Sequence, residues 1–423
     1  MLHNSYKTGS LPAFIATASA MCASSALGYN PLAAEKLAWL ADKYVANQTA
    51  DGKINPAWDP NPKDYPHAFI SMEMYKAYDA TGNAAYKTAA DKYYSYYLGI
   101  INDANVTPAR HGIALAGWAD YKRCNPGSTT YDARMDGMYN YMMDYRWSQP
   151  SYFRCGYTDP YGMDVAFSND LGLVGDGLVS YYKLTHNPAA LQAAEGLAHY
   201  FLTEMVPGTY QGVWSSTIGT WAVGPSGVTN WEHHLNTPVS TVGWGTGAQQ
   251  TTDYLIQLHA LTSDASLKQA IREKCVESMK WQFDECQFSN GALGMCGRDD
   301  WWFGMTAGAV QTFLWNYDAG FLSPTDISQY QPKALAATDW ILGHLTDNML
   351  NRAGYYPLTG ESLLEPKSHG IFYTAWAMEV LIRYDDLVAI PEPSALLLLA
   401  TGVVGLLIYV RCRSFRGSAC RVG

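Results

Sequence analysis

Apolar residues recur along most of the chain with the period of an α-helix, and this spacing predicts about twelve helices. The period-2 alternation of a strand is scarce, and no clean run longer than a few residues lies outside residues 206–242. The pattern therefore indicates an all-α domain. The predicted helices cover residues 32–47, 66–81, 84–100, 109–123, 130–146, 169–185, 188–204, 244–262, 265–285, 301–317, 331–349 and 368–386.

The predicted helices alternate between two kinds. Every second helix is rich in Gly and Ala, as at residues 112–117 and 304–309, and a helix that is small and apolar all round is buried. The helices between them are amphipathic and charged, as at residues 268–280, and face water. Six buried helices inside six amphipathic ones form an (α/α)6 toroid. A solenoid of helical hairpins is the competing arrangement, but it would show more uniform repeat lengths.

The connections between helices also alternate, and they predict where a site lies. Short turns, such as residues 81–83 and 262–264, follow the buried helices. Long loops rich in Gly, Pro and Trp precede them and are expected to gather on one face, where the buried helices have their N-termini. These loops are residues 48–65, 147–168, 205–243, 286–300 and 350–367.

Polar and aromatic residues stand at the same register, at the starts of the six buried helices. Helix N-termini present unpaired N–H groups and partial positive charge, which favour carboxylates and hydroxyl groups. This convergence predicts a binding site. We expect the substrate-binding residues to be His67, Arg110, His111, Trp244, Trp301, Trp302, His369 and Tyr373, with Trp214 from a loop.

Acidic residues in the same segments suggest the chemistry. Hydrolysis of a glycosidic bond needs one carboxyl held protonated and a second one ionised. The candidate catalytic residues are Asp164, Asp170, Asp299 and Asp300. Each has a structural alternative, since Asp170 and Asp300 fit helix N-caps and Asp164 fits a turn. The three His residues of the predicted site, taken singly, also fit hydrogen-bonding structural roles.

Composition narrows the possible partners. The net charge is −10 and no Lys/Arg-rich stripe is present, which argues against nucleic acid. The chain carries 31 Tyr, 14 Trp and 12 Phe, and Trp side chains in loops suit the apolar faces of sugar rings. The adjacent His233 and His234 lack the spacing that places two ligands on one helix face. We therefore expect no metal and no cofactor.

Both ends of the chain carry export signals. Residues 1–28 contain one Lys, no acidic residue and a weakly apolar stretch followed by small residues, and they predict a signal peptide. The uncharged run 394–410 would span roughly 26 Å as a helix, enough for a bilayer core. Pro391 and Pro393 separate this run from the body, and Arg411 and Arg413 should stay on the cytoplasmic side. These residues alone predict one C-terminal transmembrane anchor.

The order of Pro391-Glu392-Pro393, an apolar span and an Arg-rich end resembles the PEP-CTERM sorting signal of bacterial exported proteins. The resemblance implies that an exosortase-type enzyme recognises the tail at residues 388–423 in the membrane and removes it. The Arg-rich end, residues 411–423, departs from the family pattern because other residues interrupt and extend it. The body, residues 29–387, would then lie outside the cytoplasm, anchored through residues 394–410 until processing, and afterwards at the cell surface or in the extracellular matrix.

The layout of the body resembles the six-hairpin glycosidase and polysaccharide-lyase families. The nearest correspondences are Asn169-Asp170 and Asp299-Asp300-Trp301-Trp302 at the starts of buried helices. The resemblance implies a hydrolase or lyase that acts on a polysaccharide. Two other readings stay open. The protein could bind a glycan without cleaving it, or it could be a structural protein of the envelope.

Overall fold

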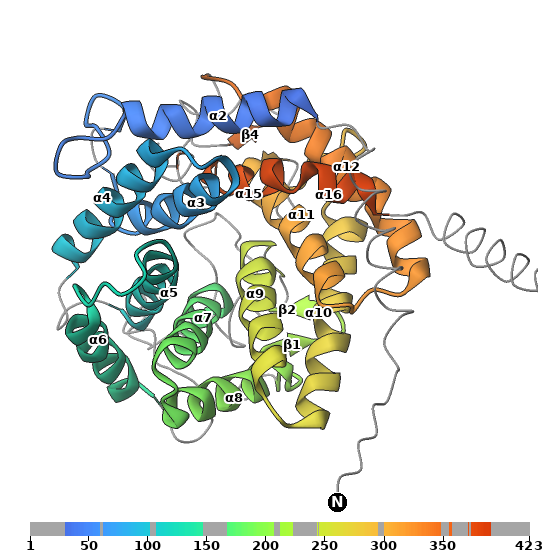
Figure 1. Ribbon diagram of the computed structural model, residues 1–423. Coiled ribbons are helices and arrows are strands. Elements are labelled where there is room, and N and C mark those ends of the chain that lie inside the picture. Colours follow the sequence, from blue (N-terminus) through green and yellow to red (C-terminus); the bar gives the residue numbers. More distant parts are fainter. Residues whose placement is uncertain are drawn as a thin grey trace, which may run out of the picture.

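The computed structural model describes residues 30–59, 62–101, 107–146, 167–206, 212–222, 243, 245–294, 300–347, 355–357, 371 and 374–390. Helices make up most of these residues, and Figure 1 shows them arranged in two concentric layers. The prediction of a mostly helical, toroid-like body is thus confirmed.

Six helices form a closed inner ring. Each contacts the next in chain order, and the last packs against the first. The ring consists of α3 (Pro66–Thr81), α5 (Pro108–Cys124), α7 (Ser168–Thr185), α9 (Gly245–Leu261), α11 (Phe303–Asp318) and α15 (Ala377–Ile382). A ring that closes in this way separates a toroid from an open solenoid.

Small residues allow the inner helices to pack closely. A Cβ added to Gly112 on α5 would lie 2.2 Å from the carbonyl oxygen of Leu173 on α7. A Cβ added to Gly177 on α7 would lie 2.5 Å from the Cα of Gly112. Neither position can accept a side chain unless the backbone moves. The Gly-rich sequence of the buried helices is therefore a packing requirement.

In the described part of the chain, seven further helices surround or close the ring. The outer layer consists of α2 (Pro31–Ala46), α4 (Ala84–Ile100), α6 (Asp132–Asp144), α8 (Pro188–Leu202), α10 (Ala265–Glu285) and α12 (Pro324–His344). The short helix α16 (Tyr384–Ala389) follows α15 and packs on α12. Gln331 of α12 donates hydrogen bonds to the carbonyl oxygens of Leu387 and Ile390, so the packed body continues to Ile390.

Helix capping distinguishes the two layers. Five outer helices begin with a side chain that accepts hydrogen bonds from first-turn amides, namely Asn30, Asn83, Asn187, Asp264 and Ser323. The inner helices α3, α5 and α7 begin without such a bond from their N-cap side chains. The capping residues in the short turns thus fix where these outer helices start. At the starts of α3, α5 and α7, groups other than the N-cap side chain must bind the free backbone N–H groups.

Two small sheets lie in the long loops. Strand β1 (Trp214–Ser215) pairs antiparallel with β2 (Thr220–Trp221), and β3 (Asp300–Trp302) pairs antiparallel with β4 (Tyr355–Pro357). The second pairing joins the loops that precede α11 and α15, so these two loops meet on the face that holds the inner-helix N-termini. This agrees with the expectation that the long loops gather on one face.

Two helices differ from the sequence prediction. Helix α12 begins at Pro324 rather than near residue 331, because Ser323 and Asp326 form a capping box and Pro332 is accommodated inside the helix. The last predicted helix, residues 368–386, is broken: α15 begins at Ala377 and a turn at Arg383 separates it from α16. The other predicted helices end within about two residues of the observed bounds, the usual uncertainty of helix ends.

The predicted export signals lie outside the described residues. These are the signal peptide at residues 1–28, the motif at residues 391–393, the span at residues 394–410 and the Arg-rich end. Within the described part of the chain, no helix is both long and apolar enough to cross a membrane.

Candidate functional site

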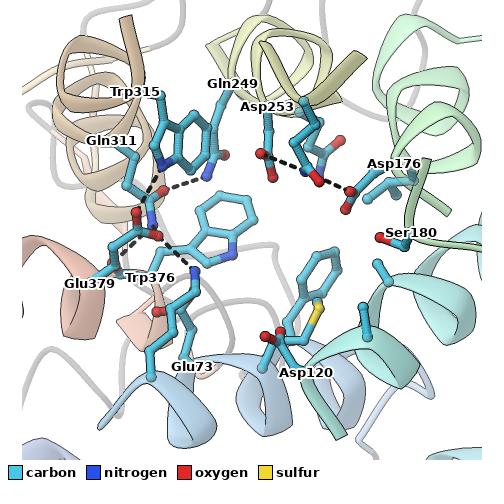
Figure 2. Close-up of a pocket in the computed structure, with 18 of the residues that line it drawn as sticks. Glu73, Asp120, Asp176, Ser180, Gln249, Asp253, Gln311, Trp315, Trp376 and Glu379 are labelled. Carbon is cyan, nitrogen blue, oxygen red and sulfur yellow. Dashed lines mark hydrogen bonds and ion pairs between the residues drawn. The ribbon is translucent and has the colours of Figure 1, made fainter. Parts of the chain in front are cut away.

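A central cavity of about 350 Å³ lies inside the inner ring (Figure 2). Five of the six inner helices, counting α15, each contribute one carboxylate to its wall, and α11 contributes Gln311 and Trp315. The acidic residues are Glu73, Asp120, Asp176, Asp253 and Glu379. A ring of acids in the middle of buried helices is costly unless partners or ligands satisfy them.

Two of these acids form a pair through a glutamine. The Nε2 amide of Gln257 donates to Asp176 at 2.8 Å and to Asp253 at 2.9 Å. Because both bonds share one nitrogen, the two carboxylate oxygens lie within about 6 Å of each other. Lys183 donates to the amide oxygen of Gln257, which fixes the orientation of the bridging amide. Neighbouring inner helices, α7 and α9, supply the two acids.

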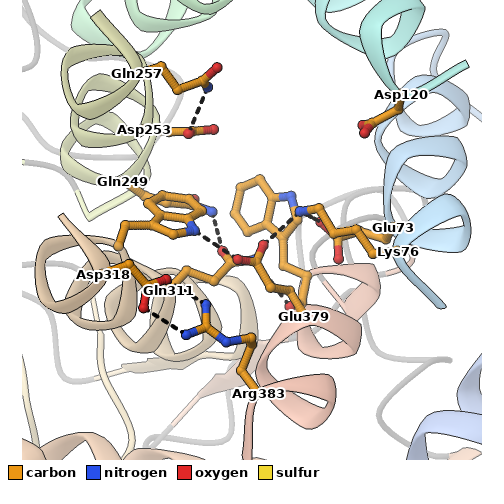
Figure 3. A network of polar contacts seen from close by, with 12 residues as sticks. Glu73, Lys76, Asp120, Gln249, Asp253, Gln257, Gln311, Asp318, Glu379 and Arg383 are labelled. Carbon is orange, nitrogen blue, oxygen red and sulfur yellow. Dashed lines mark hydrogen bonds and ion pairs between the residues drawn. The ribbon is translucent and has the colours of Figure 1, made fainter. Parts of the chain in front are cut away.

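The opposite side of the cavity holds a lysine between two glutamates (Figure 3). Lys76 Nζ lies 2.7 Å from Glu73 and 2.6 Å from Glu379. Glu379 also accepts hydrogen bonds from Gln311 at 3.0 Å and from the indole N–H of Trp315 at 2.7 Å. The other oxygen of Glu73, Oε2, is buried and has no hydrogen-bond partner among the described residues.

These environments push the carboxyl pKa values apart. Burial is the main cause that raises the pKa of Glu73 to about 8 and that of Asp120 to about 6. Burial and then repulsion from Asp176 raise the pKa of Asp253 to about 7, and burial also raises the pKa of Asp176. Burial opposes ionisation of Glu379 as well, but Lys76 outweighs it and lowers that pKa. Glu379 is thus the counter-ion of Lys76, and Glu73 is its neutral partner.

The cavity opens at the C-terminal ends of the inner helices. Arg123 and Lys183, near the ends of α5 and α7, line it and are exposed. Toward the helix starts the lining residues are buried, and Phe69 and Trp376 meet edge to face with ring centroids 5.8 Å apart. The cavity therefore lies deeper in the ring than the face on which the long loops gather.

The described part of the predicted site, at the inner-helix N-termini, contains one charged cluster. Arg110 Nε lies 3.1 Å from Asp64, and its guanidinium lies 4.2 Å from the centre of the Tyr65 ring. Burial opposes the charge of Arg110, but Asp64, with a smaller contribution from Asp170, raises its pKa. Asp170 is the third residue of α7, so it is not the N-cap, which is Phe167. Asp170 thus lies near enough to Arg110 to act on its charge.

Three other predicted residues are tied into the body. His67 is buried; its Nε2 accepts from the Ile54 amide at 3.1 Å and its Nδ1 faces the Asp64 carbonyl at 2.8 Å. The fully buried His111 has Nδ1 3.1 Å from the Thr107 carbonyl. Trp214 is 1% exposed and packs edge to face on Trp221, so its indole belongs to the core. These contacts correspond to the structural alternative for the histidines.

The remaining predicted residues are described in part or not at all. Asp300, Trp301 and Trp302 form strand β3, which leads directly into α11 at Phe303, so these residues stand just before the helix start and not within its first turn. Their backbones pair with the strand Tyr355–Pro357, a pairing that aromatic residues favour. The other predicted residues, Asp164, Trp244, Asp299, His369 and Tyr373, lie outside the described residues.

Sequence reasoning missed the cavity acids, although the chain contains a signal for them. Asp176 stands between Gly175 and Gly177, in a helix whose small and apolar residues predict burial on all sides. Acidic residues are almost never fully buried unless they are paired, so one carboxylate inside each of several buried helices marks an interior polar site. Within the described residues, no group of three or more His, Cys, Asp or Glu side chains is arranged to hold a metal ion.

Sequence comparison assigns the tail. Residues 389–414 match the PEP-CTERM protein-sorting motif, which implies export and sorting to the surface. No curated protein sequence matches the chain significantly.

Comparison of structures supports the toroid. A possible member of the GH105 family from Salmonella enterica serovar Paratyphi A aligns with a TM-score of 0.60 and 14% identity, covering 82% of this chain and 94% of that chain. A sugar epimerase from a ruminal bacterium aligns with a TM-score of 0.61 and 11% identity, covering 81% and 96%. The GH76A α-1,6-mannanase from Salegentibacter sp. aligns with a TM-score of 0.57 and 11% identity, covering 82% and 99%. At these identities the likeness establishes the fold alone.

Proposed function

We propose that the protein is a surface-sorted protein that acts on a polysaccharide, as a glycoside hydrolase-like or lyase-like enzyme. After export, an exosortase-type enzyme processes the tail, and the helical body then meets its substrate outside the cytoplasm. The sorting motif supports the first part of this proposal, and the likeness to sugar-processing toroids supports the second.

The observation that carries the catalytic part is the pair Asp176 and Asp253. Glycoside hydrolysis needs two carboxyls in different protonation states. The pKa of about 7 leaves Asp253 with a proton to donate to the leaving oxygen, while Asp176 acts as the ionised partner. Their oxygens, within about 6 Å, fit the roughly 5–5.5 Å carboxyl spacing of retaining enzymes better than the wider inverting spacing. Asp176 is then the nucleophile.

The predicted site at the inner-helix N-termini is a second location for the chemistry. There Asp170 helps to raise the pKa of Arg110, and the candidates Asp164, Asp299 and Asp300 come from the surrounding loops. In this arrangement Trp244, Trp301, Trp302, His369 and Tyr373 would bind the sugar. The two locations make different predictions, because Asp170 lies in the first turn of α7 whereas Asp253 lies in the middle of α9.

A non-catalytic glycan-binding protein is the alternative function. The bonds that Gln257, Gln311 and Trp315 make to the cavity carboxylates favour it, since partners that satisfy the acids can hold them in a purely structural arrangement. In that case the cavity would bind a sugar without turnover.

A screen of the full chain against a polysaccharide panel tests the proposal, with reducing ends and unsaturated products read together. We expect wild-type turnover that Asp253→Asn lowers at least a hundredfold, because Asn cannot donate the required proton. Loss on Asp170→Asn with full activity in Asp253→Asn would move the site to the inner-helix N-termini. Glycan binding without any product in the wild type would support the non-catalytic alternative.

A further inference from the structure

The charge of the cavity restricts which sugar can enter it. Glu379 and Lys76 neutralise each other, and Glu73 is neutral at pH 7. This leaves Asp120 and the Asp176–Asp253 pair, which carries one negative charge while Asp253 holds its proton, as a negative surface. The described lining residues place no further enclosed cation opposite it. The wall is thus acidic around the α5, α7 and α9 helices.

The basic residues at the rim offset this charge only in part, because Arg123 is shared between two carboxylates. Arg123 forms ion pairs with Asp120, at 2.8 Å, and with Asp79. Lys183 is exposed and donates to Gln257. Charges in solvent are screened, whereas enclosed charges act on a bound ligand in a low dielectric.

The remaining wall offers an unpartnered carboxyl oxygen and aromatic surface. Glu73 is 3% exposed and its Oε2 atom has no partner among the described residues, so a ligand hydroxyl, which can both accept and donate, would complete the hydrogen bonds of this wall. Trp315 and Trp376 also line the cavity, and indole rings attract cations as well as the C–H faces of sugars. The volume of about 350 Å³ lies at the small end of ligand pockets, which suits a short glycan segment.

From this arrangement we infer that the cavity selects a sugar that carries an ammonium group, such as a glucosamine unit, and rejects a sugar that carries a carboxylate. This inference rests on the proposal that a sugar enters the cavity. A uronate would add a further carboxylate beside the ionised Asp120 and Asp176, whereas an ammonium group would supply the missing positive charge and three donors.

Titration calorimetry of the full chain in detergent tests the inference with three sugars of one size: glucosamine, glucose and glucuronate. The buffer is phosphate at pH 6.5, since an amine buffer would compete. We expect glucosamine to bind at least tenfold tighter than glucose, and glucuronate to give no heat. Equal binding of glucosamine and glucose, tighter binding of glucuronate, or no binding of any of the three would overturn the inference.

Matched variants assign the effect to the cavity. The double variant Asp120→Asn and Asp176→Asn removes the two ionised carboxylates and should bring the affinities for glucosamine and glucose within about threefold of each other, with the fold checked by its melting curve. The control Glu277→Gln removes a partly exposed carboxylate that pairs with Lys274 and does not line the cavity, and should keep the full preference. Retained preference in the double variant would contradict the assignment. Polysaccharide cleavage without glucosamine preference would refute this inference alone, and glucosamine binding without cleavage would refute only the catalytic proposal.

Discussion

Replacing each of the two glutamates that pair with Lys76 by glutamine should change the free energy of unfolding in opposite directions. Burial raises the pKa of Glu73 from 4.5 to about 8, so the folded protein binds a proton that the unfolded chain releases above pH 4.5. Stability is therefore lost as the pH rises from 4.5 toward 8. Between pH 4.5 and 7 the loss amounts to about 3 kcal/mol from this one group. Glu73→Gln removes the titrating proton and should restore up to about 3 kcal/mol at pH 7, with little change at pH 4.5.

Glu379→Gln should have the reverse effect. The ionised carboxylate accepts from Lys76, Gln311 and Trp315, whereas an amide offers these three donors a single acceptor oxygen. We expect a loss of at least about 2 kcal/mol at pH 7, because bonds to charged groups are lost and the lysine loses its counter-ion.

Urea unfolding followed by tryptophan fluorescence, at pH 4.5 and pH 7, measures both variants against the wild type. The control is Glu277→Gln, a partly exposed glutamate in a surface ion pair, whose replacement should change the free energy of unfolding by less than about 0.5 kcal/mol. If Glu73→Gln destabilised the protein at pH 7 as much as Glu379→Gln, Glu73 would be an ionised member of the ion pair, and the assignment of protonation states in the cavity would be refuted.

Three further predictions concern packing, catalysis and sorting. Gly177→Ala should cost more than about 2 kcal/mol in unfolding free energy because its Cβ would meet the Gly112 backbone at 2.5 Å, whereas Gly137→Ala, which meets nothing within 4 Å, should not destabilise; equal effects would refute the close-packed ring. Turnover should fall as the pH rises above about 7, because Asp253 then loses its proton, and a rate that rises through this range would exclude it as the acid. Replacing Pro391-Glu392-Pro393 by three Ala residues should block processing of the tail while membrane insertion, followed by reporter fusions on either side of residues 394–410, is kept; normal trimming would leave a plain anchor.

The fold could be predicted from sequence because its signals are local. Helix periodicity, the short Asn- and Asp-capped turns and the Gly-rich buried helices each depend on nearby residues. The exception at α12 has a local cause as well. Pro332 favours a helix start near residue 331, whereas the capping box of Ser323 and Asp326 starts the helix at Pro324.

The site was harder to predict, because it depends on which residues face inward at the same depth. Asp120 and Asp253 are far apart in sequence, and only the closed ring brings their helices around one cavity. At the inner-helix N-termini the sequence placed Arg110 and Asp170 at the same register, and the structure shows Asp170 contributing to the raised pKa of Arg110. It gave no indication that Trp214 is buried, because a loop tryptophan has the same sequence signature in the core and in a cleft.

A crystal structure of the Asp253→Asn variant with a bound oligosaccharide, chosen from the polysaccharide that the wild type cleaves, would test the central claim most directly. The account predicts a sugar ring inside the inner helices, with its glycosidic oxygen within hydrogen-bond distance of residue 253 and its anomeric carbon facing Asp176. A sugar bound instead among the loops beside Asp170 and Arg110, with none in the cavity, would contradict it.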